Sequence, residues 1–181
     1  MKRRNAMQLI AIGAAAPLAA QQHTGHSAAE AAAPAALRFF TSEQNMLVDC
    51  IAEMIIPADE RSGGAHEAGV SLFIDGLLAD SEPAEQQAWS HALAALDGEA
   101  KRRFQKPFAE CAVDDRDRIL GGLAAKEDDP QSELERFFVK IKRQTVSGYY
   151  TSRVGLLDEL EYKGGGPLAE YELCTDPEHT E

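Results

Sequence analysis

Apolar residues recur at helical spacing along the chain from about residue 41 onward. Thr41 and Gln44 form a capping-box pattern at the start of the first such segment. Its apolar positions, three and four residues apart, are Leu47, Val48, Ile51, Met54 and Ile55. Pro57 cannot continue a helix, so the first helix is predicted to end there.

Two further helices are predicted after a polar, glycine-containing loop over residues 58–67. The apolar residues expected to share one face of the second helix are Val70, Phe73, Ile74, Leu77 and Leu78. Ser81 and Pro83 open the third helix, because proline is favoured in the first helical turn. Its predicted buried side consists of Trp89, Ala92, Leu93, Leu96 and Ala100.

A break at Lys106-Pro107 is followed by two more helical segments. The shorter fourth helix follows Asp114, and its inward positions are Ile119, Leu120 and Leu123. The fifth begins near Pro130 and places on one face Leu134, Phe137, Phe138 and Ile141. Because no segment alternates apolar and polar residues with period two, we predict an all-α fold, with one helical body of about five amphipathic helices over residues 39–148.

Residues 149–181 are predicted to form an irregular, Gly/Tyr-rich C-terminal tail. Tyrosine combines a large apolar face with a hydroxyl group, so a tail of this composition suits a protein–protein interface. The alternative is that the rings pack back over the helical body. The candidate partner-interface residues in this tail are Tyr149, Tyr150, Tyr162, Tyr171 and Cys174.

Residues 1–20 have the pattern of an export signal. Lys2, Arg3 and Arg4 precede an uncharged stretch from Ala6 to Ala20, which is short and mild for a membrane span. The adjacent Arg3 and Arg4 favour a twin-arginine signal over a general secretion signal. Residues 21–38, rich in alanine and histidine, are expected to form a flexible leader. We therefore expect a periplasmic protein, or one peripheral to the periplasmic face of the inner membrane.

Composition narrows the class of partner. The 181 residues suffice for one domain, and their formal net charge is −12. A chain this acidic cannot neutralise a run of phosphates, which excludes nucleic acid as a partner. It suits a soluble protein, or the partner of a more basic one.

Motifs for chemistry are missing from the sequence. The glycine pairs lack the Gly-x-Gly-x-x-Gly spacing of a dinucleotide site, and there is no Cys-x-x-Cys-His or His-Glu-x-x-His. We therefore assign no catalytic, cofactor-binding or metal residue. The strongest remaining cluster is in one loop: Asp59, Glu60, His66 and Glu67. It supports an alternative function, a stand-alone periplasmic metal- or ligand-binding helical protein, although charged loop residues are usually just solvated.

Three cysteines are an odd number for an exported protein. A bridge between Cys50 and Cys111 and their persistence as free thiols both remain open. Cys174 lies in the predicted tail, where it either forms a disulfide bond with a partner chain or remains a free thiol.

Three sets of residues together resemble the family of small subunits of gluconate 2-dehydrogenase, called subunit 3. The most specific is the run of residues 49–60, with Ile-Ile-Pro-Ala-Asp at its end, joined through Gly64–Val70 to Phe73-Ile74-Asp75. The second is Phe137-Phe138 with residues 145–152 and Gly155, and the third is Tyr162-Lys163-Gly164 with Pro167 and Cys174. The tail departs from the family pattern, because Glu172-Leu173 precede the cysteine where a glycine is usual.

This resemblance implies a role within a complex. The large partner in that family is an FAD-dependent dehydrogenase of the glucose–methanol–choline type, and a cytochrome c subunit with haem c often accepts its electrons. The small subunit has the export signal and accompanies the folded flavoprotein across the membrane. The resemblance thus implies a non-catalytic subunit that aids export and stability of a sugar, sugar-acid or alcohol dehydrogenase.

Overall fold

The computed structural model describes residues 36–164, and these residues contain helices and no β-strand. The α-helices are α1 (Ser42–Ile55), α2 (Val70–Ala79), α3 (Pro83–Phe104), α4 (Val113–Ala124) and α5 (Glu133–Thr151). A 3-10 turn, η2 (Phe108–Glu110), precedes α4, and a π-helical turn, η3 (Val154–Glu159), follows α5. The prediction of an all-α fold is confirmed.

Capping explains several of the helix starts. Thr41 caps α1 in a reciprocal capping box with Gln44, as predicted, and Ser132 does the same for α5 with Glu135. Pro83 occupies the first turn of α3, where backbone N–H groups have no partner within the helix, so the N–H that proline lacks is not needed. None of the helices in residues 36–164 is both long enough and apolar enough to span a bilayer.

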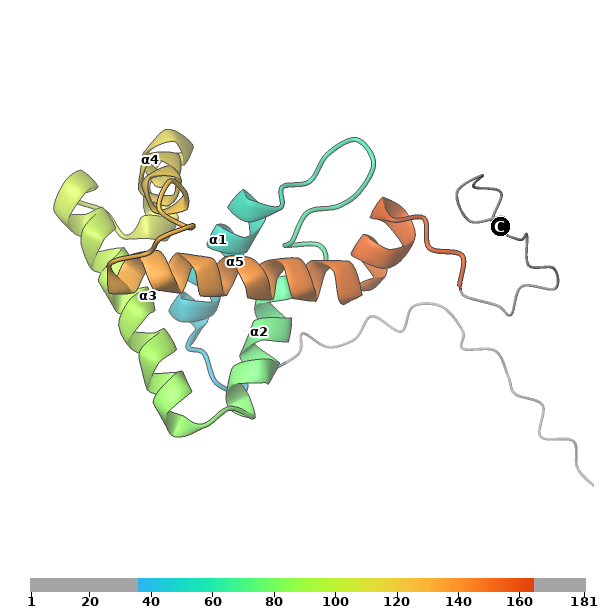
Figure 1. The fold of residues 1–181 in the computed structure, drawn as a ribbon, viewed down its shortest axis with the longest axis horizontal. Helices are drawn as coiled ribbons and strands as arrows, with labels where there is room; N and C mark the ends of the chain where they lie inside the picture. The colour runs from blue at the N-terminus through green and yellow to red at the C-terminus, as the bar shows by residue number, and fades with distance from the viewer. Residues whose placement is uncertain (1–35, 165–181) are drawn as a thin grey trace, which may run out of the picture. The chain divides into compact units, whose positions relative to one another are not determined.

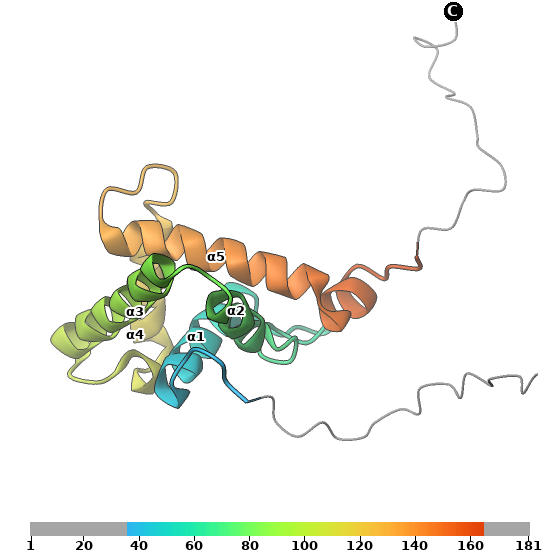
Figure 2. The same cartoon turned by 90° about the horizontal axis from the view of Figure 1, so that it is seen from below.

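Helix α5 lies across the other four helices and packs against each of them (Figures 1 and 2). Trp89 of α3 is buried where these helices meet, edge-on to Phe137 of α5 with ring centroids 5.2 Å apart. The whole predicted inner side of α3 is buried, so its helical pattern predicted both the element and its orientation.

Helix α2 is rotated relative to the prediction. Its buried face includes Ser71 and Asp75, whereas Phe73 and Leu77 are about 40% exposed. The Asp75 carboxylate explains the rotation, because it accepts the backbone N–H groups of residues 38, 39 and 40 at 2.7, 3.0 and 2.7 Å. Turning this acid inward ties the segment before α1 to α2, and places Phe40 in the core beside Trp89.

The segment 38–40 also corrects the predicted end of the leader. The sequence predicts that Arg38 ends the leader over residues 21–38. Its backbone is bound to Asp75 and its guanidinium pairs with Asp80 at 2.5 Å, so Arg38 belongs to the helical body. The predicted export signal, with Arg3 and Arg4, lies outside the described residues and stays a prediction.

The body also extends further at its C-terminal end than predicted. Helix α5 continues through Tyr149 and Tyr150, so the prediction of irregular structure from residue 149 is wrong at that boundary. Tyr149 extends the four-residue spacing set by Ile141 and Thr145, and all three are buried. Gly155 lies so close to this helix end that a Cβ there would come within 2.1 Å of the Tyr149 carbonyl oxygen.

Candidate functional site

The loop between α1 and α2 is fastened to α1 by a carboxylate. Glu53 accepts the backbone N–H of Ala58 at 3.1 Å and that of His66 at 2.8 Å, which joins the two ends of the loop. Gly64 makes this approach sterically feasible, because a Cβ there would lie 2.3 Å from the Glu53 carboxylate. Glu53 and Gly64 thus close the loop between α1 and α2 tightly.

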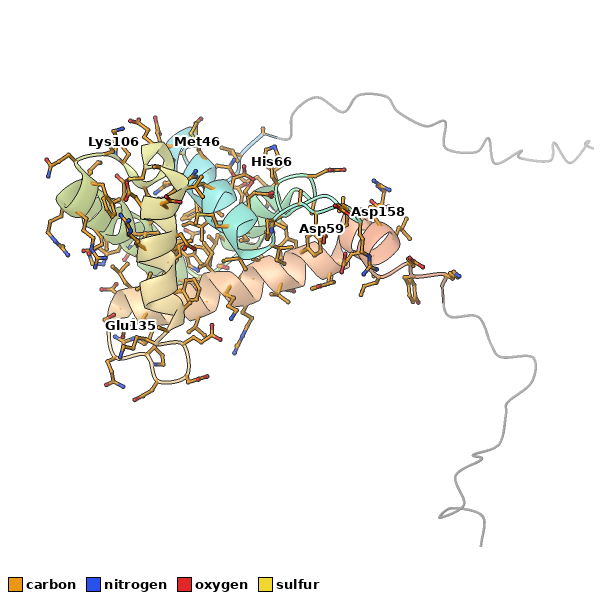
Figure 3. The ribbon with its side chains drawn as sticks, turned by 90° about the horizontal axis from the view of Figure 1, so that it is seen from above. Met46, Asp59, His66, Lys106, Glu135 and Asp158 are labelled. Carbon is orange, nitrogen blue, oxygen red and sulfur yellow. The ribbon has the colours of Figure 1, made fainter. Side chains whose placement is uncertain are left out.

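The outer part of the loop is held by the C-terminal end of the body. The Tyr149 hydroxyl donates to the Gly63 carbonyl at 2.9 Å and lies 2.8 Å from the Ser62 hydroxyl. Ser62 in turn donates to Glu159 of η3 at 3.0 Å. Figure 3 shows Asp59 near this end of α5 and His66 nearer α1. The loop is therefore bound on two sides.

The acidic loop residues do not assemble into one site. Asp59 accepts the backbone N–H groups of Arg61 and Ser62, and these hydrogen bonds lower the pKa of its carboxyl group. His66 instead pairs with Asp49 of α1, with 2.6 Å between Nδ1 and Oδ2, and this partner raises the pKa of the imidazole. Within residues 36–164, no group of three or more His, Cys, Asp or Glu residues is placed to hold a metal ion.

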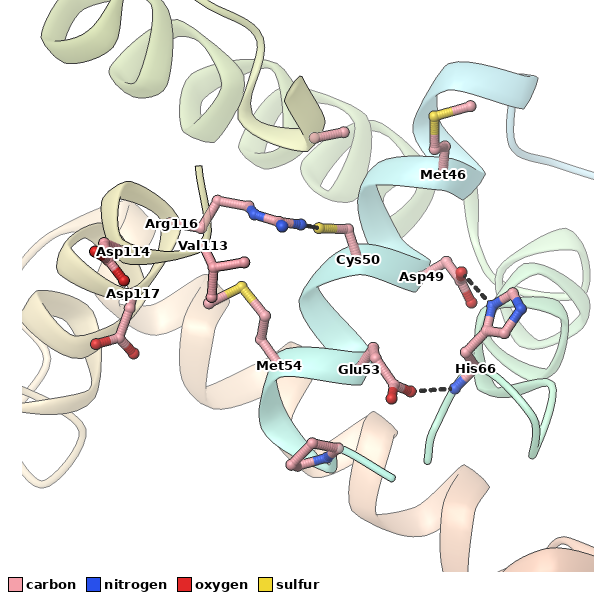
Figure 4. Close-up of a pocket in the computed structure, with 12 residues that line it drawn as sticks. Met46, Asp49, Cys50, Glu53, Met54, His66, Val113, Asp114, Arg116 and Asp117 are labelled. Atoms are coloured by element: carbon pink, nitrogen blue, oxygen red, sulfur yellow. Dashed lines mark hydrogen bonds and ion pairs between the residues drawn. The ribbon is translucent and has the colours of Figure 1, made fainter. Parts of the chain in front are cut away.

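A groove of about 670 Å³ separates α1 from α4 (Figure 4). Met46 and Val113 are its most exposed apolar residues, 62% and 63% accessible, on α1 and α4 respectively. Further apolar lining comes from Met54, Pro57 and Ala109. Sequence reasoning missed this groove, because its two sides come from segments about 60 residues apart that hydrophobic spacing cannot relate.

The charged side chains of the groove are mostly acidic. Its lining includes four carboxylates: Asp49, Glu53, Asp114 and Asp117. Asp114 and Asp117 are exposed on α4, and the ion pairs found in residues 36–164 involve neither of them. Arg116 is the arginine among the residues that line the groove, and its guanidinium donates a hydrogen bond to the Cys50 sulfur of α1 (Figure 4). An incoming side chain therefore meets apolar surface edged by negative charge.

Cys50 and Cys111 are both free thiols. Cys111 is buried, and its Sγ lies 3.4 Å from the Pro107 carbonyl oxygen. Burial raises the pKa of the Cys111 thiol, which keeps it protonated and unreactive. Cys174 lies outside the described residues.

The predicted aromatic contacts separate into two kinds. Tyr149 is 2% exposed, so this ring packs in the body and is not a surface contact. Tyr150 and Tyr162 are exposed, as are Leu157 and Leu160 of the same region. These four residues, at the end of α5 and in and after η3, are called the C-terminal apolar group below. Tyr171 lies outside the described residues.

Comparison with known proteins gives one match. Residues 42–166 match the family model for gluconate 2-dehydrogenase subunit 3, which covers all five α-helices and well over half of the chain. No curated protein and no solved structure was found that matches the chain.

Proposed function

The chain belongs to the gluconate 2-dehydrogenase subunit 3 family, and from this premise we propose that it is the non-catalytic small subunit of an exported dehydrogenase complex. Its partner is an FAD-dependent flavoprotein of the glucose–methanol–choline type that oxidises a sugar, a sugar acid or an alcohol. A cytochrome c subunit with haem c is the third member. The small subunit aids the export and the stability of the flavoprotein.

The observation that carries this proposal is the family match over all five α-helices. The family is one of subunits of a multi-subunit dehydrogenase, which implies partner subunits. The exposed C-terminal apolar group supports a contact with such a partner, because aromatic and aliphatic side chains at a surface favour protein binding. Tyr150 and Tyr162 are the predicted interface residues in this group.

Export follows the same proposal. Arg3 and Arg4 serve as the twin-arginine element of the signal, which takes folded cargo. A flavoprotein bound before transport would cross the membrane together with the small subunit and work in the periplasm or on the periplasmic face of the inner membrane.

The test is purification of the tagged chain from the envelope fraction of its own host under mild conditions. We expect a larger polypeptide with flavin absorbance to co-elute, and dye-linked assays of this complex to identify the substrate. Deleting the small subunit should leave the flavoprotein unexported or unstable. Normal export of fully active flavoprotein in the deletion strain would contradict the proposal.

Replacing Leu157 and Leu160 by Asp tests the C-terminal apolar group. Both side chains are exposed, so the fold should tolerate the change, whereas a buried contact with the partner would not. The control introduces two Asp residues at exposed positions outside both this group and the groove, Ala84→Asp and Ala125→Asp. Retention of flavin in the eluate by both variants would remove this group from the interface.

A further inference from the structure

We propose that the groove between α1 and α4 is a second docking surface for the flavoprotein, and that it binds a basic amphipathic segment. An apolar side chain of that segment enters the groove between Met46 and Val113, and flanking Lys or Arg residues face Asp114 and Asp117. This inference rests on the proposed function, because it takes the flavoprotein as the partner.

The apolar side chains in the groove support a macromolecular occupant. Met46 and Val113 are the most exposed large apolar residues in the described part of the chain, and both lie at this groove. Methionine is flexible and polarisable, which suits a surface that adapts to an incoming side chain. Burying these two side chains on binding would remove apolar surface from water, which favours association.

The charges at the groove define the chemistry of the occupant. Asp49 is already paired with His66, and Glu53 already accepts two backbone N–H groups. Asp114 and Asp117 have no such partner among the described residues and are exposed three residues apart, on one side of α4. Two unpaired carboxylates beside an apolar hollow are complementary to lysine or arginine next to an apolar residue.

Charge also weighs against two other occupants. The chain's own residues 165–181 contain five acids and no lysine or arginine, so they would be repelled by this groove. A second copy of the chain has a net charge of −12 and is repelled in the same way. A basic region of a different polypeptide would be attracted to the groove and not repelled by it.

The experiment measures binding of the purified small subunit to the purified flavoprotein at low and high salt. Asp114→Asn with Asp117→Asn should weaken the complex about fivefold at low ionic strength, and the difference should shrink at high salt. The control, Glu82→Gln with Asp128→Asn, removes the same charge from exposed residues that do not line the groove. Met46→Ala should weaken binding about tenfold at both salt concentrations, because its effect comes from lost apolar contact.

Hydrogen exchange provides a second readout that does not depend on any variant. In the complex, amides over residues 46–56 and 109–117 should exchange more slowly than in the free subunit. If the wild type binds flavoprotein but the groove variants match the control and these amides are unprotected, the groove proposal is wrong while the proposed function stands. If the wild type binds no flavoprotein, the proposed function itself is wrong. A self-associating subunit whose dimer is lost in Met46→Ala would make a second copy the occupant and overturn the inference.

Discussion

Replacing Asp75 by Ala should strongly destabilise the helical body. The Asp75 side chain is almost fully buried, and its two oxygens accept the backbone N–H groups of Arg38, Phe39 and Phe40. Alanine removes both acceptor oxygens, and with them all three hydrogen bonds. It also frees the segment that holds Phe40 against the core.

The magnitude follows from the burial of each donor. A hydrogen bond to a charged acceptor contributes about 1.5–3 kcal/mol, and a buried donor left unpaired costs a comparable amount. Only the Phe40 hydrogen bond is fully buried, whereas those of Arg38 and Phe39 are partly accessible, so their N–H groups can turn to water. We therefore expect a loss of about 3–5 kcal/mol for Asp75→Ala. Asp75→Asn keeps one oxygen and should lose about 1–2 kcal/mol.

Urea denaturation followed by the fluorescence of Trp89 measures this effect. Trp89 is the single tryptophan of the chain and is buried in the core, so its emission reports on the body directly. Asp80→Asn is the matched control, because Asp80 binds the exposed guanidinium of Arg38 and no backbone N–H group, and little change is expected. An Asp75→Ala midpoint equal to that of the wild type would refute the reasoning.

Three further outcomes can be measured on the purified chain. Gly148→Ala should lower the free energy of unfolding by about 1–3 kcal/mol in a thermal or urea experiment, because the new Cβ would lie 2.7 Å from the Phe73 ring of α2. Gly76→Ala is the control, since its Cβ meets nothing closer than 4.0 Å, and it should leave stability unchanged or slightly higher. An NMR titration of the His66 ring should give a midpoint above the ordinary histidine pKa of 6.5. The ion pair with Asp49 therefore stabilises the fold fully below pH 6.5, and this stabilisation is lost as the pH rises through the raised pKa. A midpoint at or below 6.5 would contradict the pairing. Alkylation mapped by peptide mass should modify the partly exposed Cys50 in the native state and Cys111 only on unfolding, and equal rates for the two thiols would show that Cys111 is not buried.

The helices were predictable from sequence because their signals are local. The capping box at Thr41, the proline at residue 83 and the apolar spacing of α3 all act within a few residues. The face of α2 was not predictable in this way. Phe73 and Leu77 fit an apolar stripe, but the orientation of α2 depends on Asp75 binding a segment 35 to 37 residues earlier.

In the candidate site, too, local features are predictable from the sequence and contacts between distant segments are not. The α1–α2 loop contributes to the family resemblance, but its sequence does not reveal that His66 pairs with Asp49 of the preceding helix instead of joining Asp59, Glu60 and Glu67. The position of Tyr149 is predictable in principle, since Tyr149 continues the four-residue spacing of Ile141 and Thr145 past Gly148. The α1–α4 groove depends on tertiary packing, which no local pattern encodes.

The double attachment of the α1–α2 loop has a thermodynamic consequence for assembly. One side of the loop is bound by Glu53 of α1, whose helix forms a wall of the acidic groove. The other side is bound by Tyr149 and Glu159, next to the C-terminal apolar group. A segment already restrained in this way has little conformational entropy left to lose when either surface is covered. Covering one surface should therefore require little further ordering of the loop at the other, so the subunit presents the two contacts as a pre-organised clamp.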